Sequence, residues 1–437
     1  MKRLLVIVVS SLFVLSCENN NSELQDGPNE NVSSFKEIGS ITIGSTGAAE
    51  ISAYDEVTKR LFTVNNAGTN RIDVIDLSNP SSPILIKSID LTAYNGASNS
   101  VATFNGKLAV ALEATPVKQN PGKVLVFDTS SYSLLKEIVV GALPDMITFS
   151  PDGKYILTAN EGEPSDDYSS DPEGSISIID LNNNYAVTNL NLSGFSNQLA
   201  TLRTKGFRIS SPTNNFVNDI EPEYITISSD SKTAWVTLQE NNGVAKIDLI
   251  TKQITNLFPL GFKDYNLTQN SIDIYDKDLI FFPTTWKLKG MYHPDAITNY
   301  EVNGIQYFIT ANEGDAREYS AFKDISRINS SSVVLDPAIF TNALALKADA
   351  SMGRLNINTK MGDLDGDGDL DELVSFGARS FTIWNGSTGE LVFDSKNDLD
   401  TKAKELGVYD DARSDDKSVE PESVYVAKMG NKNILFV

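Results

Sequence analysis

The feature that most constrains the fold is a unit of short strands that recurs along the chain. Its clearest copy runs from Pro144 to Gly162 and contains a strand, a Pro-Asp-Gly turn and a second strand that ends in Thr-Ala-Asn-Glu-Gly. A third strand of alternating pattern follows an insertion, at residues 174–181. Tight turns between alternating strands are typical of antiparallel hairpins. The unit therefore predicts a small antiparallel sheet.

Six further copies begin near Glu50, Val101, Pro222, Pro294, residue 355 and Pro421. No stretch has the length and 3.6-residue spacing of a long helix. Repeated four-stranded sheets around an axis are the usual setting of such units, so we expect an all-β, seven-bladed β-propeller with large insertions. A β-helix is the alternative, but its repeats are shorter and more regular. The last copy stops at Val437, so either a strand near residues 38–43 completes it or the sequence is a fragment with a truncated last blade; we expect a fragment.

The first seventeen residues are typical of an export signal. Two basic residues precede an apolar run from Leu4 to Leu15, which is too short to span a bilayer. The following Ser-Cys pair resembles a lipobox, in which Cys17 becomes the lipidated first residue; an incidental cysteine is the alternative. We expect a lipoprotein, exported and lipid-anchored in the cell envelope, on the periplasmic or surface side of the outer membrane. The expected regions are a signal peptide (1–17), a disordered polar tether (18–35) and the propeller (36–437).

Composition excludes several function classes. The formal net charge is −22, and phosphate binding needs a basic surface, so we expect no nucleic-acid partner. One histidine and one cysteine exclude multi-histidine zinc sites and Cys-His catalysis. No Gly-x-Ser-x-Gly elbow or nucleotide-binding loop is present in the sequence. An acidic chain of this kind suits divalent cations as partners.

Propeller geometry would gather acidic side chains at one mouth of the central channel. The first two strands of a blade form an antiparallel hairpin, so the start of one and the end of the other share a face. The residues at these positions are Asp145, Glu223, Asp295 and Glu422 on first strands, and Glu161, Glu240, Glu313 and, more weakly, Glu113 on second strands. Long insertions, where binding residues concentrate, leave the blades on the same face. They bring His293, Arg317 and Arg379 toward it.

Carboxylates beside two arginines suit a divalent cation that bridges to an anion. In a catalytic version, Glu161, Asp145, Glu313 and Asp295 would hold Ca²⁺, and Arg317 and Arg379 would clamp a phosphate. Alternatively, the carboxylates only cap loop amides or form exposed ion pairs. For His293, which precedes a proline, we expect a hydrogen bond to a loop rather than catalysis.

The sharpest motif is an acidic loop at residues 363–372. Oxygen ligands at alternate positions, with glycine at the sixth, describe a calcium loop. Position twelve is Val374, so the full EF-hand pattern fails, and the loop resembles the shorter calcium hairpins of integrin-type propellers. The expected ligands are the side chains of Asp363, Asp365, Asp367 and Asp371 and the backbone carbonyl of Asp369. Alignment with the clearest unit puts the loop in place of the 150–153 turn, which predicts a structural ion on the face opposite the mouth. An acidic turn without an ion is the alternative.

Five phrases together resemble the choice-of-anchor I family, at residues 141–146, 159–164, 293–296, 311–319 and 376–381. That family is related to the mesenchyme-specific cell-surface glycoproteins associated with biomineralisation. The resemblance covers about residues 40–437 and implies an exported, surface-anchored propeller. Some members carry alkaline-phosphatase-like labels, but no catalytic residues carry over.

Two functions of different class follow. The first is an envelope-anchored calcium-binding protein that binds a cation-bridged anionic ligand, polymer or mineral. The second is a calcium-dependent phosphoesterase, similar to an alkaline phosphatase or phytase, that acts at the acidic mouth. A lactonase-like esterase is a weaker third. We expect the binding function, because fold and family alone do not establish chemistry.

Overall fold

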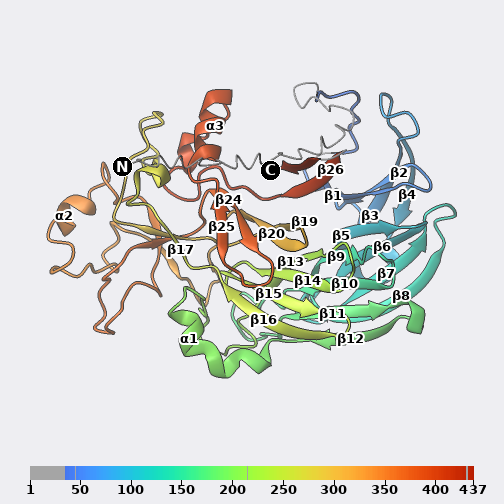
Figure 1. The fold of residues 1–437 in the computed structure, drawn as a ribbon, viewed down its shortest axis with the longest axis horizontal. Coiled ribbons are helices and arrows are strands. Elements are labelled where there is room, and N and C mark those ends of the chain that lie inside the picture. The colour runs from blue at the N-terminus through green and yellow to red at the C-terminus, as the bar shows by residue number, and fades with distance from the viewer. Residues whose placement is uncertain (1–34, 45, 214, 430–431) are drawn as a thin grey trace, which may run out of the picture.

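The computed structural model describes residues 35–44, 46–213, 215–429 and 432–437. The expected signal peptide, Cys17 and all but the last residue of the expected tether lie outside these residues. Most of the described chain forms small antiparallel sheets (Figure 1), so the expected all-β class is confirmed.

Five sheets have four strands each. The first contains β1 (Ala48–Asp55), β2 (Arg60–Asn65), β3 (Arg71–Asp76) and β4 (Ile84–Asp90). The second contains β5 (Gly96–Phe104), β6 (Lys107–Ala114), β7 (Pro121–Asp128) and β8 (Leu134–Ala142). The third contains β9 (Pro144–Phe149), β10 (Tyr155–Asn160), β11 (Ser175–Asp180) and β12 (Ala186–Leu190). The fourth contains β13 (Pro222–Ile227), β14 (Thr233–Leu238), β15 (Gly243–Asp248) and β16 (Gln253–Pro259). The fifth contains β19 (Ile297–Val302), β20 (Ile305–Asn312), β24 (Ser380–Asn385) and β25 (Leu391–Asp394).

The turns between first and second strands are built by their own side chains. In the third sheet the Ser150 hydroxyl donates to Asp152 (2.8 Å) and accepts from the Tyr155 amide (3.0 Å). In the fourth sheet Ser228 makes the same pair of bonds, to Asp230 (2.7 Å) and from the Thr233 amide (3.0 Å). Serine and aspartate favour turns because they bond to nearby backbone groups. The repeated turn therefore fixes equivalent hairpins in two sheets.

The sheets succeed one another like propeller blades. Their first strands contact in chain order, β1 with β5, β5 with β9, β9 with β13 and β13 with β19. The last of these contacts β26 (Tyr425–Met429), which pairs with β27 (Lys432–Phe436) as a hairpin. Apolar clusters fill the space between neighbouring sheets; Phe62 and Leu108, for example, lie in the cluster between the first two. The described fold is therefore propeller-like.

Two units that the sequence predicts as separate blades, those beginning at Pro294 and at residue 355, form one sheet. Strand β20 pairs directly with β24, with Asn312 opposite Ser380, so residues 313–379 are an insertion between the second and third strands. The prediction that residues 294–315 and 355–394 begin separate blades was wrong, because this insertion is longer than the repeat itself. Among the described residues, the series of propeller-like sheets consists of the five four-stranded sheets and the β26–β27 hairpin, and the count of seven blades is not confirmed.

This insertion packs with residues 260–292, and we call the two segments, residues 260–292 and 313–379, the side lobe (left in Figure 1). Its strands are β17 (Phe262–Asp264), β18 (Lys289–Met291), β21 (Ile325–Arg327), β22 (Asn356–Asn358) and β23 (Val374–Ser375), and its helix is α2 (Ala343–Leu346). Residues from both segments share one apolar core, which includes Tyr265, Ile274, Phe340 and Leu355. The lobe is therefore packed as a unit beside the blades.

Two further helices lie in connections between sheets, α1 (Leu199–Arg203) and α3 (Asp398–Leu406). Among the described residues, no helix has the length and apolar character needed to cross a bilayer. Residues 38–43, which were the alternative candidate for completing the last blade, belong to no described sheet. The nearby Phe35 ring instead packs against Phe436 of β27, with ring centroids 5.9 Å apart.

Candidate functional site

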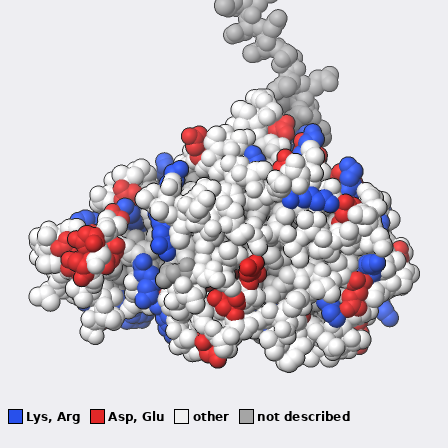
Figure 2. Space-filling model, turned by 90° about the horizontal axis from the view of Figure 1, so that it is seen from below, with Lys and Arg blue, Asp and Glu red and all other residues white. Residues whose placement is uncertain are grey.

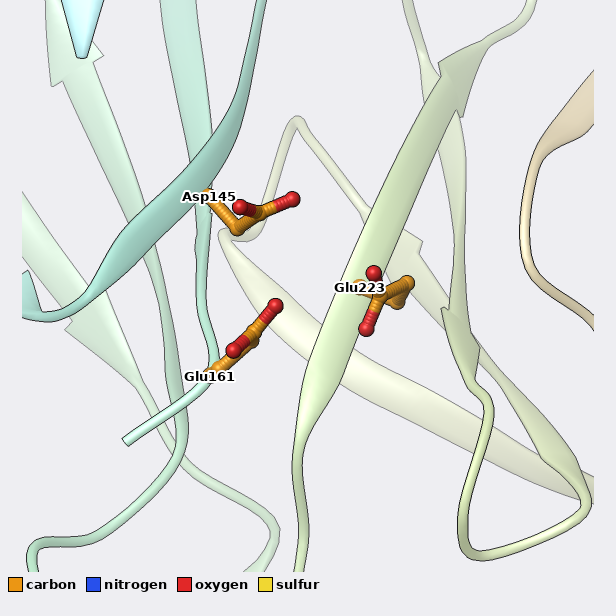
Figure 3. Close-up of side chains that lie close together, drawn as sticks. All are labelled: Asp145, Glu161 and Glu223. Atoms are coloured by element: carbon orange, nitrogen blue, oxygen red, sulfur yellow. The ribbon is translucent and has the colours of Figure 1, made fainter. Parts of the chain in front are cut away.

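Three carboxylates from two neighbouring sheets converge at the strand ends where the sequence predicts the mouth. Asp145 lies in β9, Glu161 directly follows β10, and Glu223 lies in β13. Each offers an oxygen atom, and these atoms all lie within 4.8 Å of one another. Figure 3 shows the side chains pointing into a common space between the strands. We call these three residues the carboxylate triad.

A buried asparagine positions the glutamate that follows it. At the end of β10, Asn160 accepts from the Thr158 hydroxyl (2.8 Å) and donates to Ser177 of β11 (2.9 Å). The fifth sheet repeats this arrangement at the end of β20, where Asn312 takes the place of Asn160 and precedes Glu313. These bonds hold the second strand against the third, so the next residue leaves the sheet in a fixed direction. The Thr-x-Asn-Glu phrase therefore has a structural cause.

More carboxylates surround the triad, as the sequence predicts. Burial and the neighbouring Glu223 and Asp145 raise the pKa of Glu161 well above its usual value. Burial and neighbouring carboxylates also raise the pKa of Asp145 to about 6, and that of Asp295 to about 8. Glu240 is buried, and its pKa rises to about 7 through burial and the nearby Asp315. Groups of like charge in a low dielectric disfavour ionisation, so this site resists holding its full negative charge.

Basic partners lie only at the rim of the triad. Among the described residues, no lysine or arginine forms an ion pair with the triad, whereas Lys118 pairs with Glu163, and Lys417 lies 3.3 Å from Glu313. Glu313 also accepts a bond from Gln239 (2.8 Å). Glu422 is exposed, yet it lies near enough to help raise the pKa of Asp295. Glu113, in β6, is half-buried. It also lies near enough to Asp145 to help raise the pKa of that carboxyl group.

The two arginines expected to clamp an anion are engaged elsewhere. Arg317 is 3% exposed and lies 2.6 Å from Asp219 and 3.2 Å from Glu221. Arg379 is 2% exposed and donates to the carbonyl oxygens of Asp273, Ser414 and Asp416 at 2.8–2.9 Å. The structure does not support the predicted clamp, because acceptors distant in sequence engage both guanidinium groups. Among the described residues, Nε of Arg317 has no hydrogen-bond partner.

Sequence reasoning missed the buried network around Arg317. Arg208 is buried, pairs with Asp324 and donates to the Glu240 carbonyl (2.9 Å). Burial and the nearby Arg317 lower the pKa of Arg208 to about 10. Asp324 also accepts from the Arg317 amide (3.0 Å). No local pattern marks these residues, because their partners come from separate connections.

His293 is fully buried behind the mouth. Its Nδ1 atom accepts from the Asp315 amide (3.1 Å), and its own amide donates to Asn242 (3.0 Å). The proton of the neutral ring therefore lies on Nε2, which has no hydrogen-bond partner among the described residues. Burial and Arg208 lower the histidine pKa well below its usual value. The hydrogen bond to the 313–316 loop agrees with the expected loop role.

The expected calcium hairpin lies in the side lobe. Oxygen atoms of Asp363, Asp365 and Asp371 lie within 4.8 Å of one another, and Asp371 also belongs to a second group with Asp336 and Asp369. Asp367 instead accepts from the Asp369 amide (3.1 Å). The sequence missed Asp336, which reaches the hairpin through a parallel bridge between Leu335 and Leu370. The carboxylate set fits Ca²⁺, a hard cation with oxygen ligands.

The predicted face of this hairpin was wrong. It does not replace a turn between the first and second strands of a blade. It belongs to the insertion that leaves the fifth sheet after Asn312 and returns at Ser380, at the strand ends beside Glu313. The hairpin places Leu370 and Leu373 in the core of the side lobe, so its conformation is tied to the packing of the lobe.

Comparison with solved structures gives only weak similarity. Hydrazine synthase from Kuenenia stuttgartiensis is 13% identical with a TM-score of 0.35, over 60% of this chain and 80% of that chain. A chain of the nidogen/laminin complex is 10% identical with a TM-score of 0.35, over 61% and 73%. Similarity at this level supports no argument about function.

Sequence comparison is more informative. Gigasin-3a from Magallana gigas is 32% identical over 108 residues, which span 21% of this chain and 38% of that protein. The profile of the choice-of-anchor I domain matches residues 50–437, nearly the whole chain. This family name suggests a protein that is exported or held at the cell surface. The chain belongs to the choice-of-anchor I family.

Proposed function

We propose that this protein is an exported binding protein that holds a divalent cation, with Ca²⁺ as the physiological ion, at its carboxylate triad. One observation carries the proposal. Oxygens of Asp145, Glu161 and Glu223 lie within 4.8 Å of one another, and no basic side chain among the described residues forms an ion pair with them; the nearby Lys118 pairs with Glu163 instead. Calcium is bound by several oxygen ligands at 2.3–2.6 Å, and small carboxylate movements would supply such a shell.

The electrostatics of the surroundings support the same ion. Buried charges are costly unless they are paired or coordinate a metal. Oε2 of the buried Glu240 has no hydrogen-bond partner among the described residues, and Glu240 also raises the pKa of Glu161 and Glu223. A divalent cation would reduce the repulsion within this group, as protonation of one or more carboxylates would.

The anionic ligand would then be held by the cation rather than by arginines. Arg317 and Arg379 already have acceptors, so the phosphoesterase alternative loses its proposed clamp. A binding protein is the stronger proposal for this reason. A screen with phosphomonoesters and phytate in calcium tests the alternative; turnover that Glu161→Gln abolishes would favour the enzyme.

The proposal also covers location and architecture. Cys17, outside the described residues, would carry a lipid anchor in the cell envelope, and unchanged membrane partitioning of Cys17→Ser would contradict it. The sheets would be blades of a closed propeller, with the triad at its mouth, and the count of seven blades remains a prediction.

Calcium titration by calorimetry tests the cation site. The wild type should bind at least one equivalent beyond the side-lobe hairpin, and Glu161→Gln should weaken that extra equivalent at least about tenfold, since it removes a charged ligand. The matched control is Glu301→Gln, because Glu301 is exposed on β19 with no ion pair among the described residues. Binding that stops at one equivalent, or an unchanged Glu161→Gln isotherm, would refute the proposal.

A further inference from the structure

A cavity of about 540 Å³ lies where the chain after α1 meets the side lobe. Its charged lining residues are all basic: Arg203, Arg208 and Lys360. No acidic residue lines it, although acidic residues outnumber basic ones in the whole chain by 58 to 36. Figure 2, which views the molecule from the α1 side, shows a band of lysine and arginine beside a dense acidic patch. The cavity is therefore an exception to the overall charge of the protein.

Two of these cations have no carboxylate partner. Arg203 and Lys360 are exposed and form no ion pair with the described residues. Arg208 is 2% exposed, and its charge is balanced by Asp324. Its Nε atom, however, is buried without a hydrogen-bond partner among the described residues. An unpartnered donor of this kind normally has a ligand or water as acceptor.

The remaining lining combines polar and apolar walls. Ser211 contributes a hydroxyl group, while Phe207, Phe322 and Met361 contribute apolar surface. The Lys360 amino group lies 5.6 Å from the centroid of the Phe322 ring, which holds the charge beside this wall. Sites for small molecules typically combine an apolar wall with a few polar groups that fix orientation.

We propose that this cavity binds a tetrahedral oxyanion, phosphate or sulfate, that is carried on a small organic body such as a sugar. Arg203 and Lys360 neutralise the anion, Arg208 and Ser211 donate hydrogen bonds, and the aromatic wall contacts the body. Arginine and lysine are the usual partners of such oxyanions. The site lies apart from the carboxylate triad, so it stands or falls independently of the proposed function.

The cavity adjoins the calcium hairpin, and the test must separate the two. Gly362 lines the cavity and directly precedes Asp363. Its carbonyl oxygen accepts from the amides of Asp371 (2.8 Å) and Glu372 (3.0 Å). Because the hairpin lies so close, a cation bound to it would be a second way of holding an anion in the cavity. Titration in the presence of a chelator, which removes that cation, distinguishes this case from binding by the basic side chains.

Calorimetric titration of the full chain in EGTA tests the proposal, with glucose 6-phosphate, glucose 6-sulfate and glucose as ligands. We expect one of the two esters to bind and glucose to bind at least about tenfold more weakly, because the anion supplies the charge-assisted bonds. Arg203→Gln and Lys360→Gln should each weaken the ester about tenfold. Lys232→Gln is the matched control, since it removes the same charge from an exposed turn residue outside the cavity.

A preference for the phosphate ester or for the sulfate ester would show which oxyanion the cavity binds, and either preference would support the proposed site. Equal affinity for glucose and both esters would overturn it, as would ester binding that is lost in EGTA. Equal weakening by Lys232→Gln would also overturn it, because the effect would then come from net charge alone.

Discussion

Arg317 joins the connection between the third and fourth sheets to the side lobe through buried charges. Its guanidinium lies 2.6 Å from Asp219 and donates to the Asp219 carbonyl (2.8 Å). Asp219 in turn accepts from the Ser210 amide (3.0 Å), which fixes the chain that follows α1. Removing one partner of a buried pair leaves an uncompensated charge, which costs far more than an exposed pair contributes.

Replacement of Arg317 should therefore reduce stability. We expect Arg317→Met to lower the free energy of unfolding by about 3 to 5 kcal/mol, because Asp219 and Glu221 would stay buried without their cation. Urea denaturation followed by tryptophan fluorescence measures this change. Arg203→Met, at an exposed arginine, should stay within about 0.5 kcal/mol of the wild type. A fully stable Arg317→Met variant would show that the pair is not structural.

At the scale of elements, the side-lobe hairpin links a turn to a core. Asp363 accepts from the amides of Gly366 (2.7 Å) and Gly368 (3.1 Å), and Asp371 accepts from the Leu364 amide (2.7 Å). The carboxylates of Asp363 and Asp371 nevertheless remain close together. Leu370, which directly precedes Asp371, packs into the lobe core. An ion at the hairpin would reduce the repulsion and brace this packing.

Chelation should consequently lower the melting temperature. A ligand that binds the folded state at a hundred times its Kd contributes about 2.7 kcal/mol, which EGTA would remove. Asp365→Ala and Asp371→Ala, which remove carboxylates that converge in the hairpin, should behave like chelation in differential scanning calorimetry and should add little once EGTA is present. Glu301→Ala, at an exposed position outside the lobe, serves as the control. A melting curve that ignores both EGTA and Asp365→Ala would contradict a structural ion.

At the scale of the whole molecule, the carboxylates around the triad couple several sheets through their charges. Asp145 lies in β9, Glu240 follows β14 and Asp295 precedes β19, so the three belong to different sheets or their edges. Burial together with neighbouring carboxylates raises the pKa of Glu240 to about 7, that of Asp295 to about 8 and that of Asp145 to about 6. Each group binds protons more tightly in the folded chain than in the unfolded chain, where carboxyl groups titrate near 4. Its contribution to stability is therefore present at low pH and is lost as the pH rises through the folded-state pKa.

Stability without calcium should thus fall between pH 7 and pH 8.5. Below pH 7 the lowered pKa of His293 acts in the opposite sense, because the unfolded chain then takes up the extra proton. In EGTA we expect a loss on the order of 1 to 3 kcal/mol across this window, at about 1.4 kcal/mol per unit of pKa difference. Calcium should restore the lost stability. Thermal melts at pH 7 and pH 8.5, in EGTA and in calcium, measure the change. Rising stability in EGTA would contradict the prediction.

The sequence by itself determined the features that depend on local patterns. Ser-x-Asp turns, alternating strands and the Thr-x-Asn-Glu phrase specify hairpins through bonds between residues a few positions apart, and antiparallel pairing then puts Asp145 and Glu161 on one face. The same patterns were sufficient to identify the family. Local hydrogen bonding and strand alternation need no knowledge of distant segments.

Only the tertiary structure decided which distant groups meet. It joined β20 to β24 across residues 313–379, gave Arg317 and Arg379 their acceptors, and placed the predicted calcium hairpin in the side lobe rather than in a turn between the first two strands of a sheet. It also enclosed Arg203, Arg208 and Lys360 around one cavity. The energy of a buried charge depends on partners that the fold brings from far along the chain, and no local spacing encodes them.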